Sequence, residues 1–149
     1  MTEPLTFMMG KFPAPLQADR RYCKNHMWCQ AAGEALRFGF TTYAVRLMQD
    51  VYFLDWEISE GDTIALKQKI GHIETSKAMS DLFAPVAGTL VRFNPELLND
   101  PSAINVDMYG NGWLFEIAGS DAETLSMNDY HAFLEAGWEK TQNMLKGHM

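Results

Sequence analysis

Short runs of apolar residues, many of them alternating with polar ones, recur along most of the chain. In the segment EALRFGF, Leu36, Phe38 and Phe40 alternate with other residues, which is the pattern of a half-buried β-strand. The segment DVYFLDWEI is dense in aromatic and β-branched residues and also predicts a strand. Between residues 61 and 93, strand-like segments alternate with turns of small residues. Short strands at such close spacing predict a mainly β fold of the barrel or sandwich type.

Helical spacing of apolar residues occurs in two places. The segment TTYAVRLMQ begins with threonines that can cap a helix, and it predicts a short helix near residues 41–49. Ser126 and Asp129 resemble a capping box that opens a second, longer helix over residues 126–145. The apolar stripe of this helix predicts that it packs on the rest of the protein. Its members are Met127, Tyr130, Phe133, Leu134, Trp138 and Leu145.

The length of 149 residues predicts a single domain, and the pattern along the chain divides it into three parts. Residues 1–20 contain three prolines and predict an extended N-terminal arm, residues 21–125 a β domain, and residues 126–149 a C-terminal helix packed on it. Twelve basic and nineteen acidic residues give a net charge of −7, which disfavours nucleic acid and anionic membranes as partners. Without a signal-like or membrane-spanning segment, the chain is expected in the cytoplasm.

Two cysteines flank a histidine in the segment YCKNHMWCQ. If the segment is one strand, Cys23 and Cys29 lie about 20 Å apart, because a strand rises about 3.3 Å per residue. That separation is too large for a disulfide. His26 would then point away from both thiols, so the sequence predicts no metal site here.

A single lysine lies in the segment IETSKAMSDLFAPVAG, between two apolar strand-like segments. The small residues around it predict a turn, which puts Lys77 at the tip of a hairpin with Ser76 and Ala78 leaving it accessible. Glu74 precedes it by three residues. A lysine in a turn is usually only a solvated charge. Its amine is also a group that an enzyme could acylate, which would remove the charge.

The segment around Lys77 resembles the lipoyl-attachment segment of the glycine cleavage H-protein family. The resemblance implies a lipoyl-type barrel-sandwich hybrid, or hammerhead, with lipoate joined to Lys77 through an amide. It also implies that Glu74, Gly61 and Gly88 help a lipoate ligase to recognise the hairpin. Further segments that match in the order of the family, between residues 22 and about 135, are YCKNHMWC, GFTTYA, DVYFLDW, FNPELLNDPSAIN and YGNGWLFEI.

The same resemblance implies a carrier that serves several enzymes rather than a catalyst. The histidines of the chain lie in separate segments, and no recognisable nucleophile–base arrangement accompanies them. Implied partners are a lipoate ligase or lipoyl transferase, dihydrolipoyl dehydrogenase, and either the glycine cleavage P- and T-proteins or a heterodisulfide-reductase-like complex. His26 and Trp28 occupy cleft or docking positions of the family. His72, on the strand that leads to the tip, is a further candidate for holding the arm.

Two departures from the family pattern bear on what the arm carries. Met27 stands where the family usually has a glutamate, and Gln49 stands where glycine is common. A cationic aminomethyl group prefers a carboxylate to a thioether, which offers no charge-assisted hydrogen bond. The sequence therefore leans towards the H-like lipoate-binding proteins of sulfur-oxidising prokaryotes, with a sulfur intermediate as the load. The glycine cleavage H-protein is the next hypothesis, and an H-like binding module without lipoate is the third.

Overall fold

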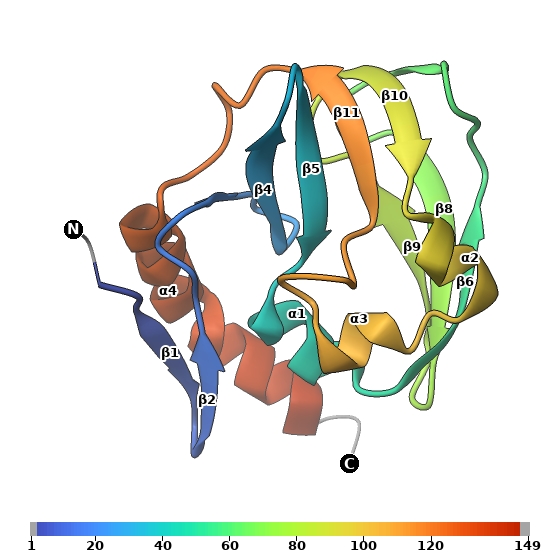
Figure 1. The fold of residues 1–149 in the computed structure, drawn as a ribbon. Coiled ribbons are helices and arrows are strands. Elements are labelled where there is room, and N and C mark those ends of the chain that lie inside the picture. The colour runs from blue at the N-terminus through green and yellow to red at the C-terminus, as the bar shows by residue number, and fades with distance from the viewer. Residues whose placement is uncertain (1–2, 147–149) are drawn as a thin grey trace.

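The computed structural model describes residues 3–146 and shows a mainly β architecture, with α4 at the left of the strands and α2 at their right (Figure 1). The elements follow the order β1 (Thr6–Met9), β2 (Phe12–Pro15), β3 (Arg21–Tyr22), β4 (Met27–Ala32), β5 (Ala35–Phe40), α1 (Thr42–Met48), β6 (Val51–Trp56), β7 (Thr63–Ile64), β8 (Lys69–Thr75), β9 (Met79–Phe83), β10 (Gly88–Phe93), α2 (Pro95–Asn99), α3 (Ala103–Val106), β11 (Phe115–Gly119) and α4 (Met127–Lys146).

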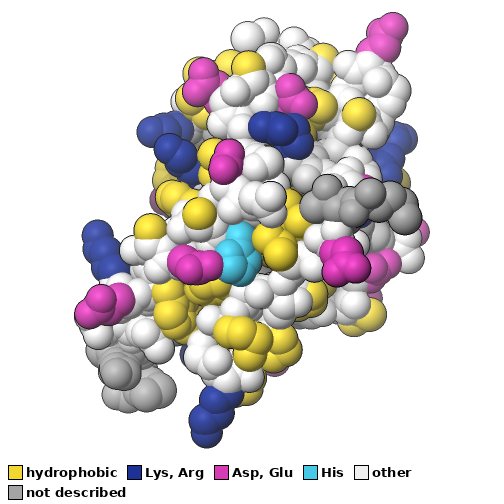
Figure 2. Space-filling view, turned by 90° about the vertical axis from the view of Figure 1, so that its left-hand side faces the viewer, with side chains coloured by type: hydrophobic (Ala, Val, Ile, Leu, Met, Phe, Trp, Pro, Cys, Tyr) yellow, Lys and Arg dark blue, Asp and Glu magenta, His cyan; other side chains and the backbone are white. Residues whose placement is uncertain are grey.

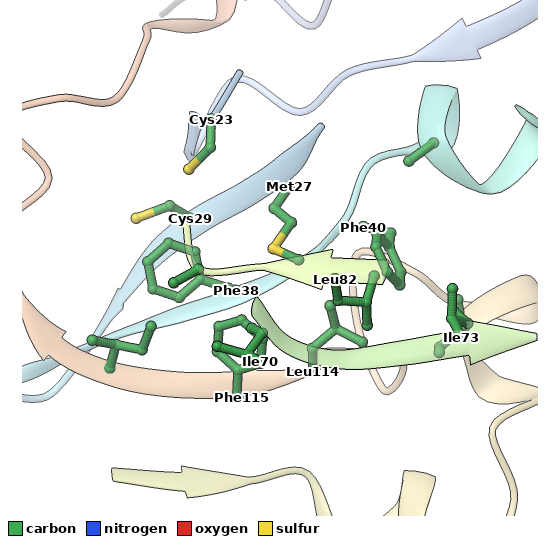
Figure 3. Close-up of a cluster of buried hydrophobic side chains, with 14 of the residues drawn as sticks. Cys23, Met27, Cys29, Phe38, Phe40, Ile70, Ile73, Leu82, Leu114 and Phe115 are labelled. Atoms are coloured by element: carbon green, nitrogen blue, oxygen red, sulfur yellow. The ribbon is translucent and has the colours of Figure 1, made fainter. Parts of the chain in front are cut away.

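Two sheets enclose the main core. One has the strand order β3-β4-β5-β11-β10-β7 and the other the order β6-β8-β9, with antiparallel pairing throughout. Phe38, Phe115 and Ile117 of the first sheet and Ile73 and Leu82 of the second belong to one buried cluster (Figure 3). The predicted barrel-sandwich hybrid is confirmed. The short helix is also confirmed as α1, with the Thr41 hydroxyl accepting from the amide of residue 44 at 3.2 Å.

The N-terminal arm is not simply extended, because it doubles back as the β1–β2 hairpin. Phe7 pairs with Ala14 and Met9 with Phe12. Gly10, with φ of 65°, occupies the first position of the two-residue turn, where hairpins of type II′ carry glycine. The prolines of β2 suit a strand that pairs on one edge only. The hairpin packs on α1 and α4 and closes a second core with them.

The predicted C-terminal helix is present as α4, up to residue 146. Met127, Tyr130 and Leu134 are buried in the second core, and the Ser126 hydroxyl accepts from the Asp129 amide at 3.1 Å. The helix therefore packs mainly on the β1–β2 hairpin and β3, at the side of the β domain (Figure 1). Residues 147–149 and the Leu145 side chain lie outside what the structure describes. No helix within residues 3–146 is both long and apolar enough to cross a membrane.

The cysteines do not lie along one strand, because Cys23 directly follows β3 and Cys29 lies in its partner strand β4. Arg21 of β3 pairs with Cys29 of β4, so the chain has reversed between the two thiols. The predicted separation of about 20 Å is wrong because residues 24–26 form a tight turn. Cys23 and Cys29 are both free and buried, and burial raises the pKa of Cys29 to about 12. Among residues 3–146, no group of three or more His, Cys, Asp or Glu side chains could hold a metal ion.

The packing of Trp28 against Gly39 offers a test of the fold. The two residues are cross-strand partners, and a methyl group on Gly39 would lie 2.5 Å from the indole ring. We expect Gly39→Ala to lower the free energy of unfolding by about 1–3 kcal/mol, as overpacked cores do. Urea unfolding followed by tryptophan fluorescence measures the change.

The matched control is Gly137→Ala, in the exposed part of α4. A methyl group there meets nothing within 4 Å, so the higher helix propensity of alanine should raise the free energy of unfolding by about 0.5–1 kcal/mol. Equal stability of the two variants would contradict the packing described for β4 and β5.

Candidate functional site

Lys77 lies at the tip of the hairpin formed by β8 and β9, as predicted. Glu74 and Met79 are the last paired residues, and Ser76, Lys77 and Ala78 form the exposed turn beyond them. Among residues 3–146, no carboxylate lies within ion-pairing distance of the Lys77 amine. The amine is therefore open to an enzyme that approaches the tip.

The tip is held in shape by Thr75, which sequence reasoning missed. Its hydroxyl oxygen accepts from the amides of Lys77 at 3.2 Å and Ala78 at 3.3 Å, and it lies 3.2 Å from the Ala78 carbonyl, to which it can donate. The Thr75 amide donates to the same carbonyl at 2.9 Å. Thr75 is only 6% exposed, so water competes little for these bonds. The signal in the sequence is a threonine placed before a turn, where its side chain can bond the backbone of the next residues.

A second brace joins the tip to the end of α1. The Ser76 amide donates to the Asp50 carbonyl at 3.1 Å. The Asn105 side chain bridges two backbone groups beside this bond. Its NH₂ group donates to the Gln49 carbonyl at 3.0 Å, and its oxygen accepts from the Val51 amide at 3.0 Å. Gln49 has φ of 62° and ψ of −139°, a conformation that favours glycine and costs other residues about 1–3 kcal/mol. The departure from glycine noted in the sequence is therefore a strained position beside Lys77.

An apolar cleft of about 640 Å³ opens beside Lys77. This volume falls within the range of roughly 300–1,000 Å³ that is usual for small-molecule sites. Its walls are the turn of the β1–β2 hairpin, the end of α1 and the second half of α4. On the face of the molecule drawn in Figure 2, apolar side chains reach the surface among charges of both signs. The lining residues are Met9, Gly10, Lys11, Phe12, Arg46, Leu47, Gln49, Lys77, Trp138 and Gln142.

Of the three residues predicted to help a ligase recognise the hairpin, only Glu74 lies near the tip. Glu74 is half-buried at the end of β8, between the neighbouring strands. Gly61, with φ of 93°, lies in the turn before β7, and its amide donates to a β10 carbonyl at 2.7 Å. Gly88, with φ of 155°, lies in β10, where a methyl group would approach the Ala118 carbonyl oxygen to 2.3 Å. Both glycines thus have backbone roles around the six-stranded sheet, away from the hairpin of Lys77.

Trp28 is not available as a docking residue. It is 1% exposed, its indole N–H donates to the Met108 carbonyl at 2.8 Å, and the Arg20 guanidinium lies 4.6 Å from its ring. The expectation of a docking position is corrected because the ring fills the space over Gly39 in the neighbouring strand. Trp28 supports the second core instead of a surface.

His26 lies in the tight turn between β3 and β4 and faces α4. Its Nδ1 is 3.0 Å from the Tyr130 hydroxyl, and burial lowers the pKa of His26 to about 4. It borders a separate cleft with Tyr43 and Phe133, not the one that Lys77 lines. The structure therefore gives His26 a neutral, packed position and does not bring it to the arm.

His72 lies on the outer face of the three-stranded sheet. It alternates along β8 with Gly71 and Ile73, which are buried. Its Nδ1 is 3.9 Å from the Asp55 carboxylate, and its ring centroid is 5.8 Å from that of Phe53. It does not line the cleft beside Lys77.

Met27 points into the main core between the two sheets (Figure 3). It is 1% exposed and pairs across the strands with Phe40. A carboxylate at this depth would need a partner to offset its desolvation. In this chain the position therefore contributes packing and no charge.

Comparison with known proteins decides the family. The sequence-family model of the glycine cleavage H-protein matches residues 20–136 of this chain. The chain belongs to the glycine cleavage H-protein family. A probable glycine cleavage system H protein of Natronomonas pharaonis is 40% identical over 118 residues, which are 77% of this chain and 93% of the relative. The H protein of Methylacidiphilum infernorum is 33% identical over 80% of this chain and 94% of its own.

The fold agrees with this assignment. The crystal structure of a glycine cleavage system H protein from Mycobacterium marinum matches with a TM-score of 0.70 and 31% identity, over 78% of this chain and 97% of that one. The family is one of lipoyl carriers, so the chain is a carrier and not a catalyst. None of these relatives is named for sulfur oxidation, so the predicted sulfur-oxidising subtype finds no support in them.

The brace at the tip leads to a prediction for Thr75→Val, which keeps the shape of the side chain and removes the hydroxyl. We expect the Lys77 and Ala78 amides to exchange with solvent about fivefold faster, because each lost hydrogen bond is worth about 1 kcal/mol. Hydrogen–deuterium exchange measured by mass spectrometry of the tip peptide gives the rate.

Thr89→Val, at an exposed position of β10, is the control and should leave the tip unchanged. Unaltered exchange in Thr75→Val would show that the hydroxyl does not hold the turn.

Proposed function

We propose that this protein is a lipoyl carrier with lipoate linked as an amide to Lys77. The observation that carries the proposal is the exposed amine, without an ion pair to any of residues 3–146, on a backbone that Thr75 and Asp50 hold in place. Glu74, Gly61 and Gly88 are proposed to help a lipoate ligase or lipoyl transferase, Glu74 at the tip and the glycines through the backbone around the six-stranded sheet. Amide formation replaces the ammonium charge of Lys77 with a neutral group.

The protein then presents the arm, and the partner enzymes perform the chemistry. Lipoate supplies a disulfide that can be reduced, loaded and reoxidised. The rigid tip keeps the attachment point fixed, and the tether keeps the local concentration of the arm high in any enzyme that docks on the hairpin. Ser76 and Ala78 leave room for such an enzyme on both sides of Lys77.

We propose glycine cleavage as the pathway, with the aminomethyl group as the load. The names of the relatives support this choice. The partners would be the P- and T-proteins and dihydrolipoyl dehydrogenase. A cytoplasmic location is proposed with it, in keeping with the free thiols of Cys23 and Cys29.

A sulfur intermediate is the second candidate load, delivered to a heterodisulfide-reductase-like complex. The observation that favours it is the absence of a carboxylate at position 27, where Met27 is buried in the core. The charged residues that line the cleft beside Lys77 are Lys11, Arg46 and Lys77 itself, all cationic. A positively charged load gains no ion pair from such a lining.

Intact mass tests the attachment. Protein purified from cells that make lipoate should carry the lipoyl mass increment, and Lys77→Arg should lack it, because arginine offers no amine that a ligase could acylate. A wild-type mass equal to that of the bare chain would favour an H-like module that is never modified and would contradict the carrier.

The load is tested with the lipoylated protein and purified glycine decarboxylase. We expect glycine-dependent exchange of labelled bicarbonate, with none for Lys77→Arg, because the arm is the acceptor of the reaction. If the lipoylated protein fails there and is instead turned over by a heterodisulfide-reductase-like complex, the aminomethyl load is wrong and the sulfur load replaces it.

A further inference from the structure

The outer face of the three-stranded sheet carries a row of three residues directly behind the tip. Glu74 of β8 pairs with Phe53 of β6 on one side and with Met79 of β9 on the other. Directly opposite residues of adjacent strands point to the same face of a sheet. Ile73, the neighbour of Glu74 along β8, lies in the main core, so the row faces away from that core. We call Phe53, Glu74 and Met79 the tip row.

The two apolar members of the tip row are open to solvent. Phe53 is 43% exposed and Met79 is 63% exposed, and the half-buried Glu74 lies between them. Single apolar residues are ordinary on protein surfaces, but two that flank one carboxylate in a paired row form a patch. Removing both side chains from water would stabilise a complex that covers the row.

The surface behind the tip row is acidic. Asp55, His72 and Asp81 form the next row, again as cross-strand partners. The Lys69 ammonium lies 3.3 Å from one carboxylate and 3.4 Å from another, so it is shared between two acids. Four carboxylates therefore stand against one ammonium on this surface. These five charged residues are Asp55, Glu57, Lys69, Glu74 and Asp81.

An enzyme that acylates Lys77 has to cover the tip row. The unmodified amine stands on a stem of only four carbons, so the active site must close around the turn itself. Met79 is two residues from Lys77 and Glu74 is three residues from it. A strand advances about 3.3 Å per residue, which puts the row within roughly 10 Å of the lysine backbone. Once lipoate is attached, the much longer arm can enter other active sites without this contact.

We propose that the tip row and the carboxylates behind it are the docking surface of the enzyme that acylates Lys77. The partner presents apolar side chains to Phe53 and Met79, and lysine or arginine side chains to the carboxylates. Opposite charges steer the two surfaces together and fix their orientation, and the buried apolar contacts hold them. The inference rests on the lipoylation of Lys77 proposed above, and it assigns the surface to the acylating enzyme and not to those that later use the arm.

The first test compares acylation rates. The full chain without lipoate is incubated with lipoate, ATP and a lipoate ligase that modifies the wild type, and the lipoyl mass is followed in time. We expect Phe53→Thr and Met79→Thr each to lower kcat/KM about tenfold, mainly through a higher KM, as truncated anchor residues of interfaces do. Val91→Thr is the matched control, since Val91 is also 43% exposed but lies on β10 of the six-stranded sheet.

The second test measures the contribution of charge. We expect KM of the wild type to rise with added NaCl, because salt screens attraction between opposite charges. Asp55→Asn should weaken this dependence. Glu34→Gln, in the turn between β4 and β5 at the opposite end of the fold from the hairpin tip, should keep it (Figure 1). Equal salt dependence in the three proteins would overturn the basic character of the partner.

A small reagent separates docking from the shape of the tip. Acetic anhydride needs no docking surface, so the Lys77 amine should react with it at the same rate in the wild type, Phe53→Thr and Met79→Thr. Mass spectrometry of the tip peptide measures this rate. A slower reaction that accompanies slower ligation would trace the effect to a distorted tip and overturn the docking surface.

A further measurement tests the assignment to the acylating enzyme. Wild type and Phe53→Thr are driven to full lipoylation with excess ligase, and reduction of the arm by NADH and dihydrolipoyl dehydrogenase is followed. We expect equal rates, because the attached arm reaches beyond the tip row. A loss as large as that in ligation would show that the surface serves the later partners too, which overturns the assignment.

The outcomes separate this proposal from the carrier function. A lipoyl mass on Lys77 with equal KM values in the wild type and both tip-row variants would overturn the docking surface and leave the carrier standing. Absence of the lipoyl mass from wild-type protein made in cells with lipoate would overturn both together.

Discussion

The hydroxyl of Thr75 is the interaction on which the functional arrangement depends. Thr75 is buried under the tip, and its hydroxyl bonds the consecutive amides of Lys77 and Ala78. The backbone of the turn is therefore fixed, while the Lys77 side chain forms no ion pair with the described residues 3–146. A carrier needs both properties at once, because the attachment point must be recognisable and the amine must be reachable. Asp50 adds a bond from outside the hairpin and ties the tip to the end of α1.

Two separate cores keep this tip in a defined environment. The main core lies between the sheets and anchors β8 and β9 through Ile73 and Leu82. The second core joins the N-terminal hairpin to α1 and α4 through residues such as Phe7 and Tyr130. The first core presents the lysine, and the second places an apolar, positively charged surface beside it.

The buried Met27 belongs to the packing between the sheets. It pairs across the strands with Phe40 and lies with it in the main core. Met27 does not line the cleft beside Lys77, whose charged lining residues are Lys11, Arg46 and Lys77 itself. The charges next to the tip therefore come from the β1–β2 hairpin, α1 and the tip, and not from the core of the sandwich.

The sequence by itself predicted several strands of the β domain, both main helices and the hairpin tip at Lys77, because these depend on local periodicity and on residues close together in the chain. The family was predicted from the resemblance of its motifs. It did not show that residues 6–15 double back, that the chain reverses between Cys23 and Cys29, or that Trp28 is buried over Gly39. Only the tertiary structure decided which segments meet at Lys77. The cleft joins residues from positions 9 to 142, and no local pattern reports a contact between segments so far apart in the chain.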